Sequence, residues 1–444
     1  MTHTHPVRGR SAPACFPGTL LALALASAGA QAEAPAPSAF DKTIEDALNL
    51  GGGEYGKVNF DLRWRYEYVD QDTAKTPSPA EASTARLRVG YLSPEFLGFK
   101  VFGEYEGNQD IGVNDYNSGR NGKLKYPVVA DPQINEVNQL WVSYGGVPKS
   151  LFKVGRQRLI FDNHRFIGNV IWRQMEQTYD AATVTTTLIP RTTATAGYLF
   201  GVQDILSHYA RMNSPVLNVN FDTGYGKLIG YGYWLDFRDK GPEGGRNALT
   251  GAPSYAKSNK TYGIRFDSGA AGTPINDWLK ALYTLEYAHQ QNYEDNPKTY
   301  ETDYWLAEGG LDIYGVTLKA AWEQLGADNG VGFQTPLATL HAFQGWADLF
   351  LATPKNGIRD MYGTLKYTLF GVDLMAVYHE FSDQHGGQDY GREVDLQAEK
   401  KFGKHYAVLL KYADFVADPG IAGNPALSKL VDTQKFWIQG SVAF

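Results

Sequence analysis

Pairs of arginines, each pair separated by a single residue, recur in the N-terminal half of the sequence. The stretch KVNFDLRWRYEYV at residues 57–69 holds one pair, and the stretch ARLRVGY at residues 85–91 holds another. A guanidinium keeps its charge and presents several N–H donors in one plane, so a row of guanidiniums attracts anions. We expect an anion-attracting surface if the backbone places four side chains on one face: Arg63, Arg65, Arg86 and Arg88.

The same stretches indicate which backbone structure carries the arginines. In residues 57–69 the even positions are apolar or aromatic, and the odd positions are polar or charged. Alternation with a period of two is typical of a β-strand with one apolar and one polar face. Similar alternation recurs to the last residue and predicts about eighteen strands, the clearest at 85–91, 229–237, 279–289, 316–322, 372–378, 406–412 and 436–444.

The connections between these segments alternate in length. The short ones span residues 93–98, 145–149, 188–191, 222–227, 313–315 and 403–404. The long ones span residues 70–81, 107–131, 238–257, 291–302, 326–360 and 417–432. Long external loops and short periplasmic turns are typical of outer-membrane barrels. The sequence therefore predicts an all-β fold, a transmembrane up-and-down antiparallel β-barrel over residues 56–444, in the outer membrane of a Gram-negative cell.

The N-terminal segment has the pattern of a secretory signal peptide. Arg8 and Arg10 precede a short apolar run, and the sequence Ala-Gln-Ala ends at residue 32. A basic start, an apolar centre and small residues at the cleavage point are the signature of such a peptide. We therefore predict a signal peptide at 1–32 and a periplasmic leader at 33–55, with a short helix over residues 40–50.

Composition and motifs argue against several other classes. The only cysteine, Cys15, lies in the predicted signal peptide, whose removal changes the formal net charge from −7 to −9. An acidic balance is not the footprint of a nucleic-acid-binding protein. The histidines are scattered, and no serine lies in a nucleophile elbow. No group of residues has metal-ligand spacing. We therefore predict neither an enzyme nor a cofactor or metal site.

The membrane determines which strand face must point inward. An arginine that faces lipid at mid-strand costs about 2–4 kcal/mol, so the charged faces should line the lumen. The same reasoning places Glu393 and Asp395 inside. A barrel of about eighteen strands is too wide for side chains to fill, which predicts a water-filled pore. The alternative is that inward arginines only pair with acids of neighbouring strands and stabilise the wall.

One stretch resembles a known family. Residues 154–174 read VGRQRLIFDNHRFIGNVIWRQ, and the GRQRL core is similar to the signature region of the alginate export family of outer-membrane channels. Residues 337–348 and 376–396 support the resemblance. It implies a monomeric, eighteen-stranded barrel whose electropositive lining conducts an anionic polysaccharide. By this resemblance Arg156 and Arg158 help line the conduit, and Arg173 of the same stretch joins the candidates.

We therefore expect a channel for passive passage of an anionic polysaccharide or a sugar-derived anion. The alternatives are a general porin for small solutes and an adhesive or purely structural barrel. The expected partners are the anionic solute, outer-membrane lipid and the barrel assembly machinery, which reads a C-terminal strand ending in an aromatic residue. Periplasmic secretion components are a further partner class. No nucleic acid is expected.

The long connection 326–360 has a helical pattern of its own. Thr335 is a suitable N-cap, Pro336 fits the first helical position, and apolar residues follow near helical spacing. An apolar face in an external loop must be buried somewhere. It either folds into the lumen as a constriction or packs on the rim of the barrel.

Overall fold

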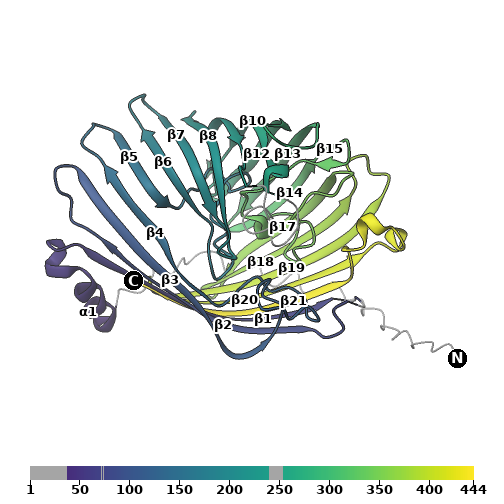
Figure 1. Ribbon diagram of the computed structural model, residues 1–444, viewed down its shortest axis with the longest axis horizontal. Coiled ribbons are helices and arrows are strands. Elements are labelled where there is room, and N and C mark those ends of the chain that lie inside the picture. The colour runs from purple at the N-terminus through teal and green to yellow at the C-terminus, as the bar shows by residue number, and fades with distance from the viewer. Residues whose placement is uncertain (1–37, 72, 74, 240–253) are drawn as a thin grey trace. The chain divides into compact units, whose positions relative to one another are not determined.

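The computed structural model describes residues 38–71, 73, 75–239 and 254–444 (Figure 1). The predicted signal peptide and the first residues of the predicted leader lie outside these ranges. The first described element is a helix, α1 (Ala39–Leu48), which the leader was expected to contain, and the 3₁₀ turn η2 (Leu50–Gly53) follows it. No described helix has the length and apolarity of a membrane-spanning helix.

Eighteen of the described strands form the wall. They are β1 (Lys57–Gln71), β2 (Ala80–Leu92), β3 (Phe99–Asp115), β4 (Ile134–Tyr144), β5 (Ser150–Gln157), β6 (Thr178–Thr186), β7 (Thr192–Gln203), β8 (Tyr209–Asp222), β9 (Lys227–Leu235), β10 (Asn259–Asp267), β12 (Leu279–Asn292), β13 (Glu301–Ile313), β14 (Val316–Leu325), β17 (Ile358–Leu369), β18 (Val372–Ser382), β19 (Asp389–Phe402), β20 (Tyr406–Ala417) and β21 (Thr433–Ala443).

Antiparallel pairing joins each wall strand to its neighbours in chain order. The sheet closes on itself because β1 pairs with both β2 and β21 (Figure 1). A short strand, β11 (Thr273–Asn276), pairs with β12 beside the end of β10. The described part of the chain thus confirms the prediction of an antiparallel barrel of eighteen strands.

The remaining described elements lie in the connections. They are the hairpin of β15 (Ala327–Asp328) and β16 (Val331–Gly332), and the 3₁₀ turns η3 (Ser254–Lys257), η4 (Leu340–Ala342), η5 (Pro419–Ile421) and η6 (Pro425–Leu427). Short turns join β2 to β3, β4 to β5 and β6 to β7, and the strand pairs between them are joined by longer connections. One long connection, residues 158–177, was not predicted, because its apolar residues resemble a continuation of the preceding strand.

Side-chain exposure follows the predicted alternation. On β1 the side chain of Trp64 is 39 % exposed, whereas Arg65 beside it is fully buried. Leu62 and, on β2, Val89 are exposed in the same way as Trp64, and Arg63 is buried like Arg65. The outer face is therefore apolar and suited to lipid, and the inner face carries the charges.

Two long connections fold against the inner face of the wall. Leu337 and Phe350 of one, and Phe166 of the other, belong to a single buried apolar cluster with inward side chains of the strands, such as Tyr304 and Phe381. The connection between β14 and β17 thus lies inside the barrel, which was one of the two expected arrangements. The helix predicted from Thr335 onward is wrong. Only the 3₁₀ turn η4 forms, because the wall fixes this segment through contacts to its backbone.

We predict that an arginine on the outer face is far more costly than one on the inner face. Leu62→Arg should lower the free energy of folding into bilayers by about 2–4 kcal/mol, because the guanidinium would meet lipid. Asn59→Arg, on the inner face of the same strand, is the matched control. Denaturant unfolding in phospholipid bilayers, followed by tryptophan fluorescence, measures both. An equal loss for the two variants would contradict the assignment of faces.

Candidate functional site

The arginines of the first two strands lie together on the inner face. In the register of β1 and β2, Arg63 is directly opposite Arg86, and Asp61 is opposite Arg88. All four arginines of these strands are buried, with relative exposures of 6 % or less. The two-residue spacing in the sequence therefore does place the four guanidiniums on one surface.

Acids of β1, of the neighbouring strand β3 and of the connection after β5 neutralise much of this surface. Asp61 approaches Arg86 to 2.5 Å, and Glu106 of β3 forms an ion pair with Arg88. Glu176, from the connection after β5, lies 3.6 Å from Arg88. A buried charge is stable only when it is paired and hydrogen-bonded. Strand neighbours and inner connections supply this pairing.

The arginines of β1 also hold the connection 158–177 against the wall. Arg65 donates a hydrogen bond of 2.6 Å to the carbonyl oxygen of Trp172, and its guanidinium lies 3.9 Å from the centre of that ring. Arg63 donates to the carbonyl oxygens of Ile171 and Arg173. No ion pair to Arg63 exists among the described residues, so backbone carbonyls and one glutamine are its main partners. Arg63 and Arg65 therefore hold connection 158–177 in place through hydrogen bonds to its backbone.

Arg173 connects the two inner connections to the wall. Its guanidinium lies 3.0 Å from Glu67 of β1, 3.6 Å from Asp131 and 3.3 Å from Asp348. Burial lowers the pKa of Arg173, but these three carboxylates outweigh that effect and raise it above its ordinary value. One charged side chain thus links β1, the connection after β3 and the connection after β14.

Asp348 is the corresponding anchor on the second inner connection. Burial would raise the pKa of this carboxyl, but His341, Lys435 and Arg173 hold it well below its ordinary range. Burial lowers the pKa of His341, so its ring is neutral at pH 7. A neutral ring can donate from Nδ1 to Asp348 (2.7 Å) and accept at Nε2 from Lys411 (2.7 Å). This relay fixes both ends of the imidazole.

The candidate acids Glu393 and Asp395 also hold this connection. Glu393 accepts a hydrogen bond of 2.7 Å from the backbone N–H of Ala347, and Asp395 accepts one of 3.2 Å from that of Trp346. Both carboxylates are buried on the inner face of β19. In the described structure, they are therefore partners of a loop backbone.

The two inner connections are joined to each other. Gly168 N–H donates to the carbonyl oxygen of Leu337 (2.9 Å), and Thr339 N–H donates to that of His164 (3.0 Å). The same two segments form an isolated parallel β-bridge between Ile167 and Leu337. The segments should therefore move as one body.

The two arginines of the GRQRL core, Arg156 and Arg158, lie in different environments. Arg156 lies opposite Asp180 and pairs with it at 2.8 Å, whereas Gln157 lies opposite Tyr179, whose hydroxyl contacts the inner connections. Arg156 is therefore on the outward face of β5, apart from the inner arginines. Arg158 follows the end of the strand and contacts Glu176 at 2.5 Å and Glu104 at 2.9 Å.

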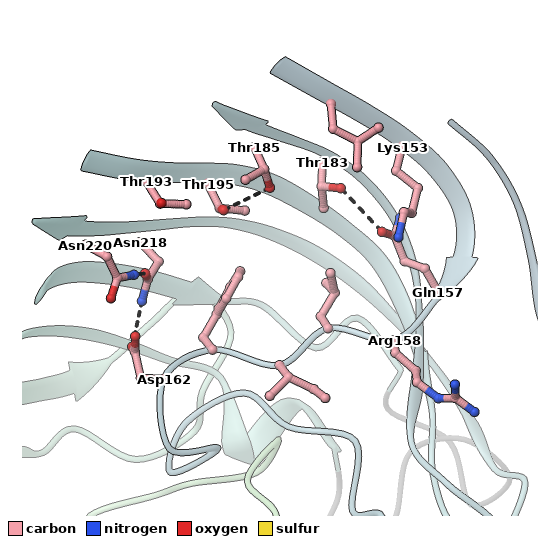
Figure 2. Close-up of a pocket in the computed structure, with 14 residues that line it drawn as sticks. Lys153, Gln157, Arg158, Asp162, Thr183, Thr185, Thr193, Thr195, Asn218 and Asn220 are labelled. Carbon is pink, nitrogen blue, oxygen red and sulfur yellow. Dashed lines mark hydrogen bonds between the residues drawn. The ribbon is translucent and has the colours of Figure 1, made fainter. Parts of the chain in front are cut away.

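A polar cavity of about 300 Å³ lies on the inner face of β5 to β8, between the short turns and the first residues of connection 158–177. Figure 2 shows four threonines on neighbouring strands, with Lys153 at one end of the row and Asn220 at the other. Arg158 and Asp162 border the cavity from the connection. The lining thus combines two cations and one carboxylate with hydroxyl and amide groups.

Sequence reasoning missed most of the acids that neutralise the arginines. Glu104 and Glu106 alternate with glycine and tyrosine in the stretch FGEYEGN, so their inward face was readable. Asp131 and Glu176 lie in connections, where no periodic signal exists. The outward position of Arg156 had a signal too, because Phe152 and Val154 share its face and are exposed. The outward position of Arg156 does not fit the lining role predicted for it, and the lining role of the other eight charged candidates stays a prediction.

A closed β-barrel with an apolar outer face and a charged interior defines an outer-membrane channel of the porin class. The alginate export family model matches residues 55–199 of this chain, and this match confirms the resemblance over that part. Together the fold and the match confirm the predicted location in a Gram-negative outer membrane. No curated protein matches the sequence.

Solved porin structures share the fold. OccAB3 of Acinetobacter baumannii superposes with a TM-score of 0.68 at 14 % identity, covering 88 % of this chain and 99 % of that one. A BenF-like porin of Pseudomonas fluorescens Pf-5 gives 0.64 at 14 % identity, with coverages of 88 % and 99 %. OpdK of Pseudomonas aeruginosa, solved with vanillate, gives 0.62 at 11 % identity, with coverages of 87 % and 98 %. These likenesses show the fold.

We predict that removing the Arg173 guanidinium loosens the inner loops. Arg173→Met leaves Glu67 and Asp348 without their shared cation, so single-channel conductance and current noise in planar bilayers should both increase. Arg191→Met, at an exposed short turn, is the matched control and should leave the current unchanged. A wild-type conductance for Arg173→Met would contradict the bridging role.

We also predict that the second inner connection narrows the channel. Replacing residues 333–352 with a short glycine-serine linker should raise single-channel conductance, because this segment lies against the inner wall. Circular dichroism checks that the barrel is retained. Unchanged conductance in a folded variant would mean that the segment does not restrict the current.

Proposed function

We propose that the protein is a diffusion channel for small anionic solutes derived from sugars. The observation that carries this proposal is the lining of the polar cavity. Lys153 forms no ion pair among the described residues, and its Nζ lies 4.4 Å from the centre of the Trp141 ring in a cation–π contact. A lumenal cation without a neutralising carboxylate raises the local concentration of anions.

Arg158 is the second cation of the cavity, and Glu104 and Glu176 pair with it. The side chain of Arg158 is 33 % exposed, the largest exposure among the candidate arginines that form inner ion pairs. Burial raises the pKa of Asp162, the single carboxylate of the lining. Because Glu104 and Glu176 engage Arg158, the preference for anions depends on Lys153.

Size favours small molecules over a polymer. Connections 158–177 and 326–357 occupy part of the interior, are bonded to each other and are fastened to the wall on several sides. Passage of a polysaccharide would require both segments to leave these contacts together. A small solute needs only the space that they leave.

The alternative is a small-solute porin without charge preference. The observation that favours it is the pairing of the arginines, because Arg86, Arg88 and Arg173 each have carboxylate partners. Paired charges contribute little net potential at a distance. The two functions differ in whether the channel prefers anions or shows no ion selectivity.

The reversal potential in a KCl gradient tests the proposal. We expect the wild-type channel to favour chloride, and Lys153→Glu to shift the permeability ratio toward potassium by at least a few-fold, since about 1 kcal/mol per lumenal charge pair is involved. Lys404→Glu, at the exposed turn between β19 and β20, makes the same charge change away from the cavity. Potassium preference in the wild-type channel, or none, would overturn the proposal.

A further inference from the structure

We propose that the polar cavity is a saturable binding site for one polyhydroxylated carboxylate, a sugar acid of a single ring. This inference rests on the proposed function and adds one defined place in the lumen at which the solute binds. The cavity volume of about 300 Å³ lies at the lower end of the range for small-molecule sites. It therefore suits a ligand of one ring.

One wall of the cavity is a grid of hydroxyl groups. Thr183 and Thr185 of β6 face inward at two-residue spacing, as do Thr193 and Thr195 of β7. Thr185 and Thr195 are cross-strand neighbours, with their hydroxyl oxygens 3.0 Å apart (Figure 2). Each hydroxyl can donate and accept, so the grid can match the hydroxyl groups of a sugar in several orientations.

The opposite side of the cavity is apolar. Ile160 is 44 % exposed, and Phe161 beside it stacks on Tyr233 with ring centres 5.9 Å apart. A sugar ring has C–H faces and a hydroxyl-bearing rim. A lining with one apolar and one hydroxyl-rich side therefore suits such a ring better than it suits a simple inorganic anion.

The charge of the ligand follows from the two ends of the cavity. Lys153 lies opposite Thr183 in the β5–β6 register and forms no ion pair among the described residues, so it can pair with a single carboxylate. At the other end Asp162 accepts from Asn218 at 2.7 Å and offers a further acceptor to a sugar hydroxyl. Arg158 is already engaged by Glu104 and Glu176, so the site offers one free cation and fits a monoanion.

The residues that line the site lie toward the short-turn end of the strands. Connection 158–177 separates them from the long-loop end. A solute that arrives from the short-turn side should therefore reach it without passing the inner loops. This asymmetry distinguishes the site from general attraction of anions by the lumen.

The test measures flux and current through the purified full-length barrel in bilayers, with glucuronate as the probe and glucose as the neutral comparison. Glucuronate flux should saturate, and block of the KCl current should be stronger when glucuronate is added on the short-turn side. Lys153→Gln should raise the half-saturating concentration about tenfold, the loss expected for a charge-assisted hydrogen bond. Thr185→Val with Thr195→Val should raise it several-fold.

Thr186→Val is the matched control, because Thr186 is on the outward face and bonds to Ser150. It should leave saturation unchanged. Linear glucuronate flux through a wild-type channel that still prefers chloride would overturn the binding site and leave the proposed function standing. A wild-type preference for potassium would overturn the proposed function itself. Equal saturation by glucose would overturn the assignment to a carboxylate.

Discussion

The arrangement of the inner connections in this barrel depends on one constraint, which is that buried charges need partners. The inner face of β1 and β2 carries four guanidiniums with almost no exposure to solvent. Water cannot satisfy them there, so carboxylates and backbone carbonyls must do so. The carbonyls come from connection 158–177, which is why that connection lies against the wall. Arg173 then extends the same network to the second inner connection through Asp348.

The lipid environment imposes the complementary condition on the outer face. Because charged groups are costly there, each strand must sort its residues by a period of two, and this sorting is legible in the sequence. The position of Arg156 is consistent with the condition. It lies on the outward face, but near the long-loop end of β5 and paired with Asp180, and the cost of a charge falls toward the membrane interface.

These two conditions explain what the sequence could predict. Alternation identified the strands, their faces and the closure of the sheet, because a membrane barrel tolerates few exceptions to it. It could not identify which acid meets which arginine, since that depends on register and on aperiodic connections. Glu176 is 88 residues from Arg88 in the chain and reaches it only through the inward fold of connection 158–177. The burial of Phe166 could not be predicted for the same reason, because it packs on inward apolar side chains of the strands only after connection 158–177 folds into the barrel.

The pairing also changes where ion selectivity must arise. A row of arginines in the sequence implies a strong positive potential. In the folded chain, nearby carboxylates neutralise most of that charge. The groups that remain to attract a solute are those whose partners are neutral or absent, and Lys153 is the clearest of them. It lies beside hydroxyl and amide groups and forms no ion pair among the described residues, unlike Arg158 of the same cavity, which Glu176 joins to the arginine network. The arginines of the inner face therefore hold the loops, whereas Lys153 attracts the solute. A substitution that loosens the loops should leave the attraction of the solute intact, and the reverse should also hold.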